Sequence, residues 1–220
     1  MRLTILLFDG FTALDIVGGY EVLANVPGVE TEFAAARRGP VWADTRRLAL
    51  TAFKTFDEID RTDIVYVPGG PGVTPALNDP TLLDTIQRLA TGATWTVGIC
   101  NGVELLGKAG LLRGKQVTTN WVARDKVASH GAIVGTRRYV RDGQLITGAG
   151  VSASIDAGLF LAGLLAGEQV ARTLQLGIEY YPDPPFGNGT PDTASDFAKS
   201  IVRQFEAEGA ERIRSLTAPA

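Results

Sequence analysis

Short apolar runs alternate with amphipathic segments along most of the chain. The apolar runs have the length of buried strands, and several of them end at a glycine turn; they span residues 3–8, 29–36, 63–70 and 94–100. The segments between and after them carry apolar residues at helical spacing; they span residues 12–26, 80–91, 101–112 and 122–131. Strands and helices that alternate in this way predict a parallel sheet covered by helices on both faces.

The second half of the chain adds a hairpin and more helices. Asp142-Gly143, within residues 136–150, is a strong two-residue hairpin signal. Two short strands are also expected on either side of Arg46-Arg47, and a third at residues 116–121. Apolar helices are expected at 152–167 and 168–181, followed by a loop at 182–192 and an amphipathic helix. That last helix, roughly 195–216, carries four large apolar residues: Phe197, Ile201, Phe205 and Ile213.

We therefore expect one α/β domain over residues 1–220. Its C-terminal segment, 195–220, is expected to pack on the domain or on a partner subunit. With 220 residues and 45% hydrophobic content, the chain is long enough for one substantial core.

Composition excludes several classes of function. The net charge is −3 and no basic run stands out, so nucleic acid is not an expected partner. Polar residues interrupt the apolar stretches too early for a membrane span. The single cysteine and single histidine leave no disulfide framework, CxxC motif or multi-histidine metal site, and we expect no metal or cofactor. The N-terminal apolar run is too short for a signal peptide, so we expect a cytoplasmic protein.

The only cysteine lies in the stretch Gly98-Ile99-Cys100-Asn101-Gly102, between an expected strand and an expected helix. G-x-C-x-G at such a junction is analogous to the nucleophile elbow, whose tight turn requires flanking residues without a Cβ. The start of a helix also favours the thiolate form of a cysteine. A buried packing cysteine is the alternative, but the two glycines favour a nucleophile.

Two other strand exits are expected at the same edge of the sheet as Cys100, because ligand sites of parallel sheets form at the carboxyl ends of the strands. The exit at Val67–Gly72 offers the backbone N–H groups of Gly69 and Gly70, which together with the Asn101 N–H are candidates for an oxyanion hole. An ordinary glycine-rich turn is the alternative. The first strand leads to Asp15, between Leu14 and Ile16, an unexpected place for a charge unless it faces a cleft.

Asp15 is the expected acid–base partner of Cys100. His130 is interpreted as a surface or helix-capping residue, and Glu21 as a solvated one. An aspartate that faces the cysteine would share one proton with it. Such a carboxyl group suits an enzyme in which it first donates and then accepts a proton.

These features together resemble the ThiJ/PfpI superfamily, which has a glutamine-amidotransferase-like fold. The resemblance runs from Met1 to about Leu176 and is most specific in FDGFTALDIVGGYEVL, VPGGPG, GICNGVELLGKAGLLRGKQVTTNW and RRYVRDGQLITGAGVSASIDAGL. The isonitrile hydratase branch is the most similar one, because it uses an aspartate after the first strand. The resemblance implies a flavodoxin-like three-layer sandwich, usually a homodimer, with Cys100 as nucleophile and Asp15 as its carboxyl partner.

The chain departs from the pattern of this branch at three places. Asn101 stands where threonine is typical, and Asn120 replaces the histidine of the TTHW segment. Gly18-Gly19 replaces the usual Gly-Pro. These departures bear on the particular substrate more than on the type of reaction.

Three hypotheses of function follow. The first is hydration of an isonitrile to an N-substituted formamide, in which Cys100 attacks the terminal carbon while Asp15 delivers a proton and then activates water. Trp121 and Val151 would line the pocket for this small molecule. The second is a glyoxalase or deglycase acting on methylglyoxal-like aldehydes, and the third is a non-catalytic redox or ligand sensor that uses Cys100.

Overall fold

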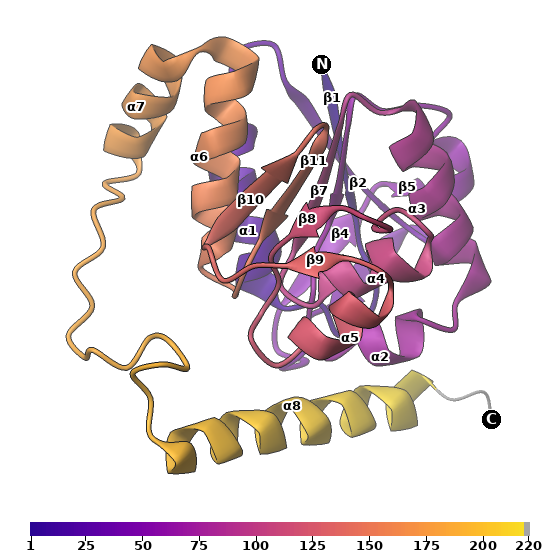
Figure 1. Cartoon of the computed structure of the whole chain (residues 1–220). Helices are drawn as coiled ribbons and strands as arrows, with labels where there is room; N and C mark the ends of the chain where they lie inside the picture. Colours follow the sequence, from indigo (N-terminus) through magenta and orange to yellow (C-terminus); the bar gives the residue numbers. More distant parts are fainter. Residues whose placement is uncertain (218–220) are drawn as a thin grey trace.

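A seven-stranded sheet runs through the centre of this computed structural model, which describes residues 1–217 (Figure 1). The strand order is β10-β11-β7-β6-β1-β2-β5, and only the β10–β11 pair is antiparallel. The strands are β1 (Arg2–Leu6), β2 (Glu30–Ala35), β5 (Lys54–Thr55), β6 (Ile64–Val67), β7 (Trp95–Ile99), β10 (Tyr139–Asp142) and β11 (Leu145–Gly148). The prediction of a mostly parallel sheet with a hairpin at Asp142-Gly143 is confirmed.

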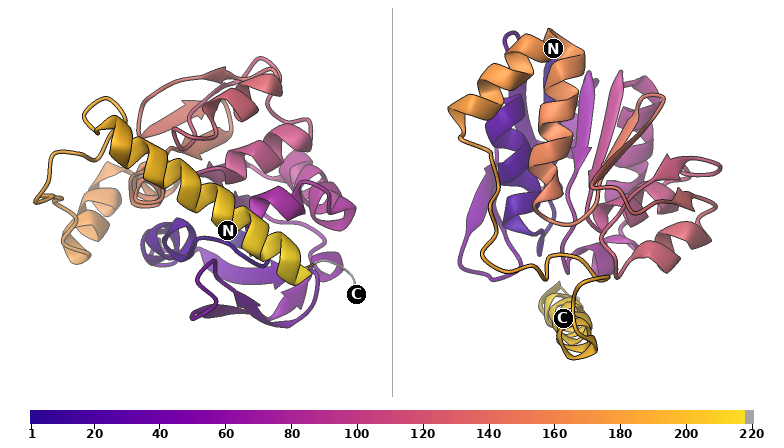
Figure 2. Two further views of the ribbon diagram at one scale, coloured as in Figure 1. Left: turned by 90° about the horizontal axis from the view of Figure 1, so that it is seen from below. Right: turned by 60° about the vertical axis from the view of Figure 1, so that its left-hand side comes forward.

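Helices cover both faces of the sheet, as Figure 2 shows in its right-hand view. One face is covered by α1 (Ala13–Leu23) and α6 (Ala153–Ala166), with α7 (Glu168–Gly177) against α6. The other face is covered by α2 (Val73–Ala76), α3 (Pro80–Gly92) and α4 (Gly102–Lys108), with α5 (Arg124–Ser129) beyond α4. The expected three-layer α/β sandwich is therefore confirmed.

The sheet separates two apolar cores, because successive side chains of a strand point to opposite faces. Ile5 belongs to the core under α1 and α6, whereas Leu6 belongs to the core under α3 and α4. Both side chains are fully buried. A central strand buried on both faces reads as a continuous apolar run in the sequence.

β9 (Ile133–Val134) is the short strand that follows α5. Three other short elements have no counterpart in the sequence predictions: β5, α2 and the 3-10 turn η1 (Phe56–Glu58). Each has two to four residues, which is too few for hydrophobic periodicity to detect. The pairs β3 (Gly39–Trp42) with β4 (Ala49–Ala52), and β8 (Gln116–Val117) with β9, form two small separate sheets. The two short strands expected around Arg46-Arg47 are confirmed as β3 and β4.

Gly18 and Gly19 lie in the middle of α1, where they weaken the helical pattern of the sequence. A Cβ at Gly18 would lie 2.9 Å from Cγ1 of Ile155 in α6, and one at Gly19 would lie 2.9 Å from the ring of Tyr66. The missing side chains therefore allow α1 to approach both α6 and the sheet. Close packing offsets the lower helix propensity of the two glycines.

A long helix, α8 (Asp196–Thr217), follows an extended connection and crosses the carboxyl edge of the sheet (Figures 1 and 2). The expected helix at 195–216 is confirmed, whereas residues 218–220 of the predicted C-terminal segment lie outside the described residues. Its apolar residues do not share one environment: Ile213 is fully buried, while Phe197 and Phe205 are 77% and 67% exposed. Within residues 1–217, no helix is both long enough and apolar enough to span a membrane.

Candidate active site

Cys100 lies at a strained turn between β7 and α4. Its φ of 56° is in the left-handed region, which is uncommon for a residue with a side chain. A Cβ at Gly98 would lie 2.6 Å from Cδ1 of Leu106, and one at Gly102 would overlap the carbonyl of Pro68. The prediction that the elbow needs glycines on both sides is therefore confirmed, and the reason is close packing.

Two hydrogen bonds hold the backbone of Cys100 in this conformation. Its N–H donates to the carbonyl of Gly148 at 3.0 Å, and its carbonyl accepts from Oγ1 of Thr119 at 2.7 Å. Both partners lie on segments other than β7 and α4. Tertiary structure therefore holds a conformation that the local sequence disfavours, a pattern typical of functional sites.

Asp15 lies in the first turn of α1 and is fully buried. Its Oδ2 accepts a hydrogen bond from the N–H of Gly69 at 2.7 Å, and its Oδ1 has no partner among the described residues. The pKa of Asp15 is raised to about 7, and burial is the main cause. The hydrogen bond from the Gly69 N–H lowers this pKa, and the negative charge of Asp44 adds to the rise. Such a carboxyl group can gain and lose a proton near neutral pH.

The thiol of Cys100 is held in its neutral form. Burial is the main cause of its raised pKa, and the negative charges of Asp15 and Glu206 add to it, while the N–H of Asn101 acts in the opposite direction. The expectation that the start of the helix would favour the thiolate is wrong, because desolvation and two carboxylates outweigh that N–H. No hydrogen bond joins Asp15 to Cys100 among the described residues. A Cβ at Gly69 would lie 2.9 Å from both the backbone N of Asn101 and Oδ2 of Asp15, so the carboxyl group lies beside the elbow.

The backbone N–H groups of the Gly69-Gly70 turn already have partners. Gly69 donates to Asp15, and Gly70 donates to Oδ1 of Asn101 at 2.7 Å. The expectation that these two groups form an open oxyanion hole does not fit this geometry. The N–H of Asn101, which points toward the sulfur of Cys100, is the candidate donor that remains.

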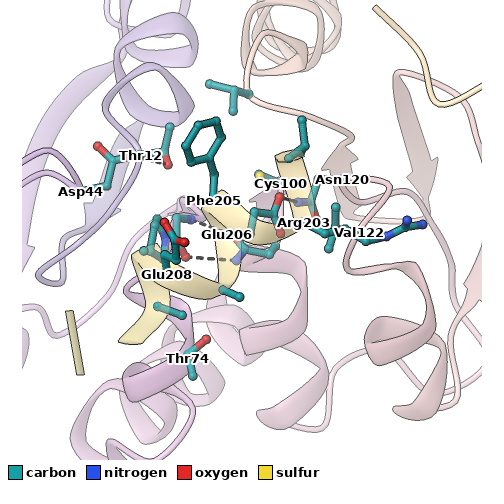
Figure 3. A pocket seen from close by; sticks show the side chains of 18 of the residues that line it. Thr12, Asp44, Thr74, Cys100, Asn120, Val122, Arg203, Phe205, Glu206 and Glu208 are labelled. Atoms are coloured by element: carbon teal, nitrogen blue, oxygen red, sulfur yellow. Dashed lines mark hydrogen bonds between the residues drawn. The ribbon is translucent and has the colours of Figure 1, made fainter. Parts of the chain in front are cut away.

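Cys100 lines a cavity of about 480 Å³ that is covered by α8 (Figure 3). Only 6% of the cysteine is exposed, although the residue forms part of the cavity wall. Three other residues expected at the site, Gly70, Asn101 and Val151, also line the cavity. Residues of α8 form much of the opposite wall, including Arg203, Phe205, Glu206, Gly209 and Arg212.

Trp121 and His130 lie outside this lining. The ring of Trp121 is covered by the guanidinium of Arg203, which lies 4.8 Å from the ring centroid. His130 follows α5, and its ring packs against Gly107 of α4, where a Cβ would lie 2.7 Å away. Trp121 therefore supports the covering helix rather than the wall of the cavity, and His130 is a packing residue at a helix end.

Asn120 and Glu206 form a contact that sequence reasoning missed. Nδ2 of Asn120 donates to Oε1 of Glu206 at 2.9 Å, and both residues line the cavity (Figure 3). Burial raises the pKa of Glu206, while the positive charge of Lys126 and the Asn120 hydrogen bond lower it. The sequence separation of 86 residues gives no local signal for this pair. The described residues contain no cluster of His, Cys, Asp and Glu arranged to hold a metal ion.

Comparison with known proteins agrees with the fold. Residues 1–162 match the DJ-1/PfpI family. The isonitrile hydratase of Pseudomonas putida is 42% identical over 194 residues, which is 88% of this chain and 85% of that protein. A deglycase of Thermococcus kodakarensis is 28% identical over 151 residues, 67% of this chain and 89% of that protein.

A solved structure extends the similarity to the C-terminal part of the chain. A ThiJ/PfpI family protein from Pseudomonas syringae superposes with a TM-score of 0.90 at 33% identity, and the match covers 98% of this chain and 89% of that one. The family match spans well over half of the residues, and the resemblance expected from the sequence motifs is confirmed. This chain therefore belongs to the DJ-1/PfpI family.

Proposed function

We propose that the protein hydrates an isonitrile to an N-substituted formamide, with Cys100 as the nucleophile and Asp15 as the proton carrier. The observation that carries the proposal is a buried carboxyl group of pKa about 7 that lies beside the elbow of a neutral thiol, which itself lines a cavity. Similarity to an isonitrile hydratase over most of the chain supports this choice of reaction.

The chemistry of the pair suits the terminal carbon of an isonitrile. That carbon accepts a nucleophile only as it is protonated, so it needs a proton and a sulfur at the same place. At a pH between the pKa values of Asp15 and Cys100, the two side chains together hold one proton. The Asp15 carboxylate takes this proton from the thiol and passes it to the carbon, while Sγ of Cys100 bonds to the same carbon.

The product of this step is a thioimidate, in which the substrate carbon carries one hydrogen, the sulfur and the substrate nitrogen. Water then adds to the carbon, the carbon–sulfur bond breaks, and a formamide leaves as the thiol is restored. The overall change is the addition of one water molecule, with no oxidant, reductant or cofactor. The cavity of about 480 Å³ is large enough for a small isonitrile.

Incubation of the purified protein with cyclohexyl isocyanide tests the proposal directly. We expect N-cyclohexylformamide from the wild type, and loss of turnover in Cys100→Ala and Asp15→Asn. Glu211→Gln, an exposed change on α8, serves as the matched control. No product from the wild type, or equal rates in Cys100→Ala, would overturn the proposal. Conversion of methylglyoxal to lactate without formamide production would instead support the glyoxalase alternative.

A further inference from the structure

Of the two residues proposed to carry the chemistry, only Cys100 lines the cavity. Cys100 lines the cavity, whereas Asp15 is fully buried and lies outside the cavity lining among the described residues. Asp15 can pass a proton to a carbon that is bonding to the adjacent sulfur. A water molecule that attacks this carbon must approach from the cavity, and on that side it meets α8.

We infer that Glu206 of α8 is a second catalytic carboxylate, which activates the water that releases the formamide. This inference rests on the proposed function and divides its two steps between two acids. Asp15 transfers the proton while the carbon–sulfur bond forms, and Glu206 activates the water that adds to the same carbon. The sequence hypothesis assigned both roles to Asp15.

The geometry of Glu206 suits this role. It is half-buried in the wall of the cavity that contains Cys100, and its Oε1 accepts a hydrogen bond from Asn120. No hydrogen bond from the described residues reaches its Oε2, so one oxygen of this cavity-lining carboxylate is held and the other has no partner. Figure 3 shows Glu206 reaching from α8 toward Cys100 and Asn120. A held carboxylate with one unoccupied oxygen is the arrangement that a general base for water requires.

The electrostatic surroundings agree with this geometry. Glu206 is close enough to Cys100 for its charge to raise the pKa of the thiol. Lys126, which also lines the cavity, favours the ionised form of Glu206. The carboxylate therefore shares one cavity with the sulfur of Cys100 and with a compensating positive charge.

Helix α8 is held firmly enough to place this side chain. Gly209 packs against Pro71, where a Cβ would lie 3.0 Å from Cγ of the proline. Ile213 is buried against Gly10, and the guanidinium of Arg203 covers Trp121. These contacts lie on both sides of Glu206 along the helix, so the carboxylate is positioned from both ends.

The step balances without another reactant. Glu206 takes one proton from water as the hydroxide bonds to the thioimidate carbon, and it passes that proton to the substrate nitrogen. The carbon–sulfur bond then breaks as the carbonyl forms. The hydroxyl proton returns to the sulfur, so the enzyme regains its thiol and both carboxylates.

The test separates formation of the thioimidate from its breakdown. Glu206→Gln keeps the size of the side chain and the hydrogen bond from Asn120, but it removes the base. After rapid mixing with cyclohexyl isocyanide, we expect intact-protein mass spectrometry to show this variant carrying one isonitrile on Cys100. Its kcat for formamide should fall roughly 100-fold or more. Hydroxylamine, a stronger nucleophile than water, should release the bound group and restore turnover.

The controls distinguish this inference from the proposed function. Glu211→Gln, which removes an exposed carboxylate of α8 that pairs with Arg214, should behave as the wild type. Asp15→Asn should form no adduct. Two results would overturn the role of Glu206, provided that the wild type turns over. One is a kcat of Glu206→Gln within about threefold of the wild type, and the other is a low kcat without any adduct on Cys100. A wild type that forms neither adduct nor formamide would instead overturn the proposed function.

Discussion

The side chain of Asn101 pairs with both backbone groups of Gly70. Its Oδ1 accepts from the Gly70 N–H at 2.7 Å, and its Nδ2 donates to the Gly70 carbonyl at 3.0 Å. The residue after Cys100 therefore joins the elbow to the turn that follows β6. Threonine, typical of the isonitrile hydratase branch at this position, has a single hydroxyl group and cannot form the same pair of bonds with amide geometry.

Asn101→Ala removes both hydrogen bonds and leaves the two Gly70 groups without these partners. We expect the free energy of unfolding to fall by about 1–3 kcal/mol, because partly buried backbone groups lose their hydrogen bonds. Urea denaturation measures this change. Asn25→Ala removes an exposed side-chain bond to the Glu21 carbonyl and should cost less. Equal losses in the two variants would contradict a linking role for Asn101.

Asp15→Asn should make the protein more stable at alkaline pH. The pKa of Asp15 rises from 3.8 to about 7 on folding, so folding favours the protonated form. Its contribution to stability is fully present below pH 3.8 and is lost as the pH rises to 7. The asparagine variant does not lose this contribution, so its advantage should grow from near zero at pH 4 to about 4 kcal/mol at pH 8.

Urea denaturation of the two proteins across this pH range measures the difference. Glu21→Gln, an exposed change on the same helix, should show little difference from the wild type at any pH. A stability advantage of Asp15→Asn that did not grow between pH 4 and pH 8 would contradict a buried carboxylate at neutral pH.

The pH dependence of isonitrile hydration should follow the proton that Asp15 and Cys100 share. Below pH 7 the pair holds two protons and Asp15 cannot accept the thiol proton, so kcat/KM should fall about tenfold per pH unit. Above pH 7 it should reach a plateau that extends past pH 9, because the thiol retains its proton there. Initial rates from pH 5 to 9, corrected for reaction without enzyme, test this profile. A rate that declines from pH 6 to 8 would show that a different protonation state is active.

Gly102→Ala should destabilise the elbow. Its Cβ would overlap the Pro68 carbonyl, and backbone on both sides of the contact leaves little room to relax, so we expect a loss of about 1–3 kcal/mol. Gly92→Ala is the matched change, since nothing lies within 4 Å of a Cβ there. That variant should be unchanged or slightly more stable because alanine favours the helix. Thermal unfolding of both variants measures the contrast.

Gly209→Val should lift α8 from the cavity. The new side chain would meet Pro71, so the helix can no longer approach as closely. We expect faster alkylation of Cys100 by iodoacetamide and faster amide exchange in α8. Gly189→Val, in an open part of the preceding loop, should change neither rate. Unchanged alkylation in Gly209→Val would show that α8 does not limit access to the sulfur.

The sequence by itself determined the architecture and singled out two candidate residues. Buried strands and amphipathic helices are long enough for their periodicities to be detected, and their alternation predicts a parallel sheet whose ligand sites lie at the carboxyl ends of the strands. The glycines around Cys100 and the charge of Asp15 between two apolar residues are local signals, so the elbow could be predicted without coordinates and Asp15 could be named as a candidate partner of Cys100.

Only the tertiary structure decided what surrounds that pair. The protonation states of Asp15 and Cys100 depend on burial, which no local pattern reports. Asp15 and Asn101 occupy the expected oxyanion donors of Gly69 and Gly70, and α8 places Glu206 against Asn120 across 86 residues of sequence. Desolvation and long-range contact exist only after the chain has folded, and for this reason the contact between Glu206 and Asn120 has no signature in the sequence.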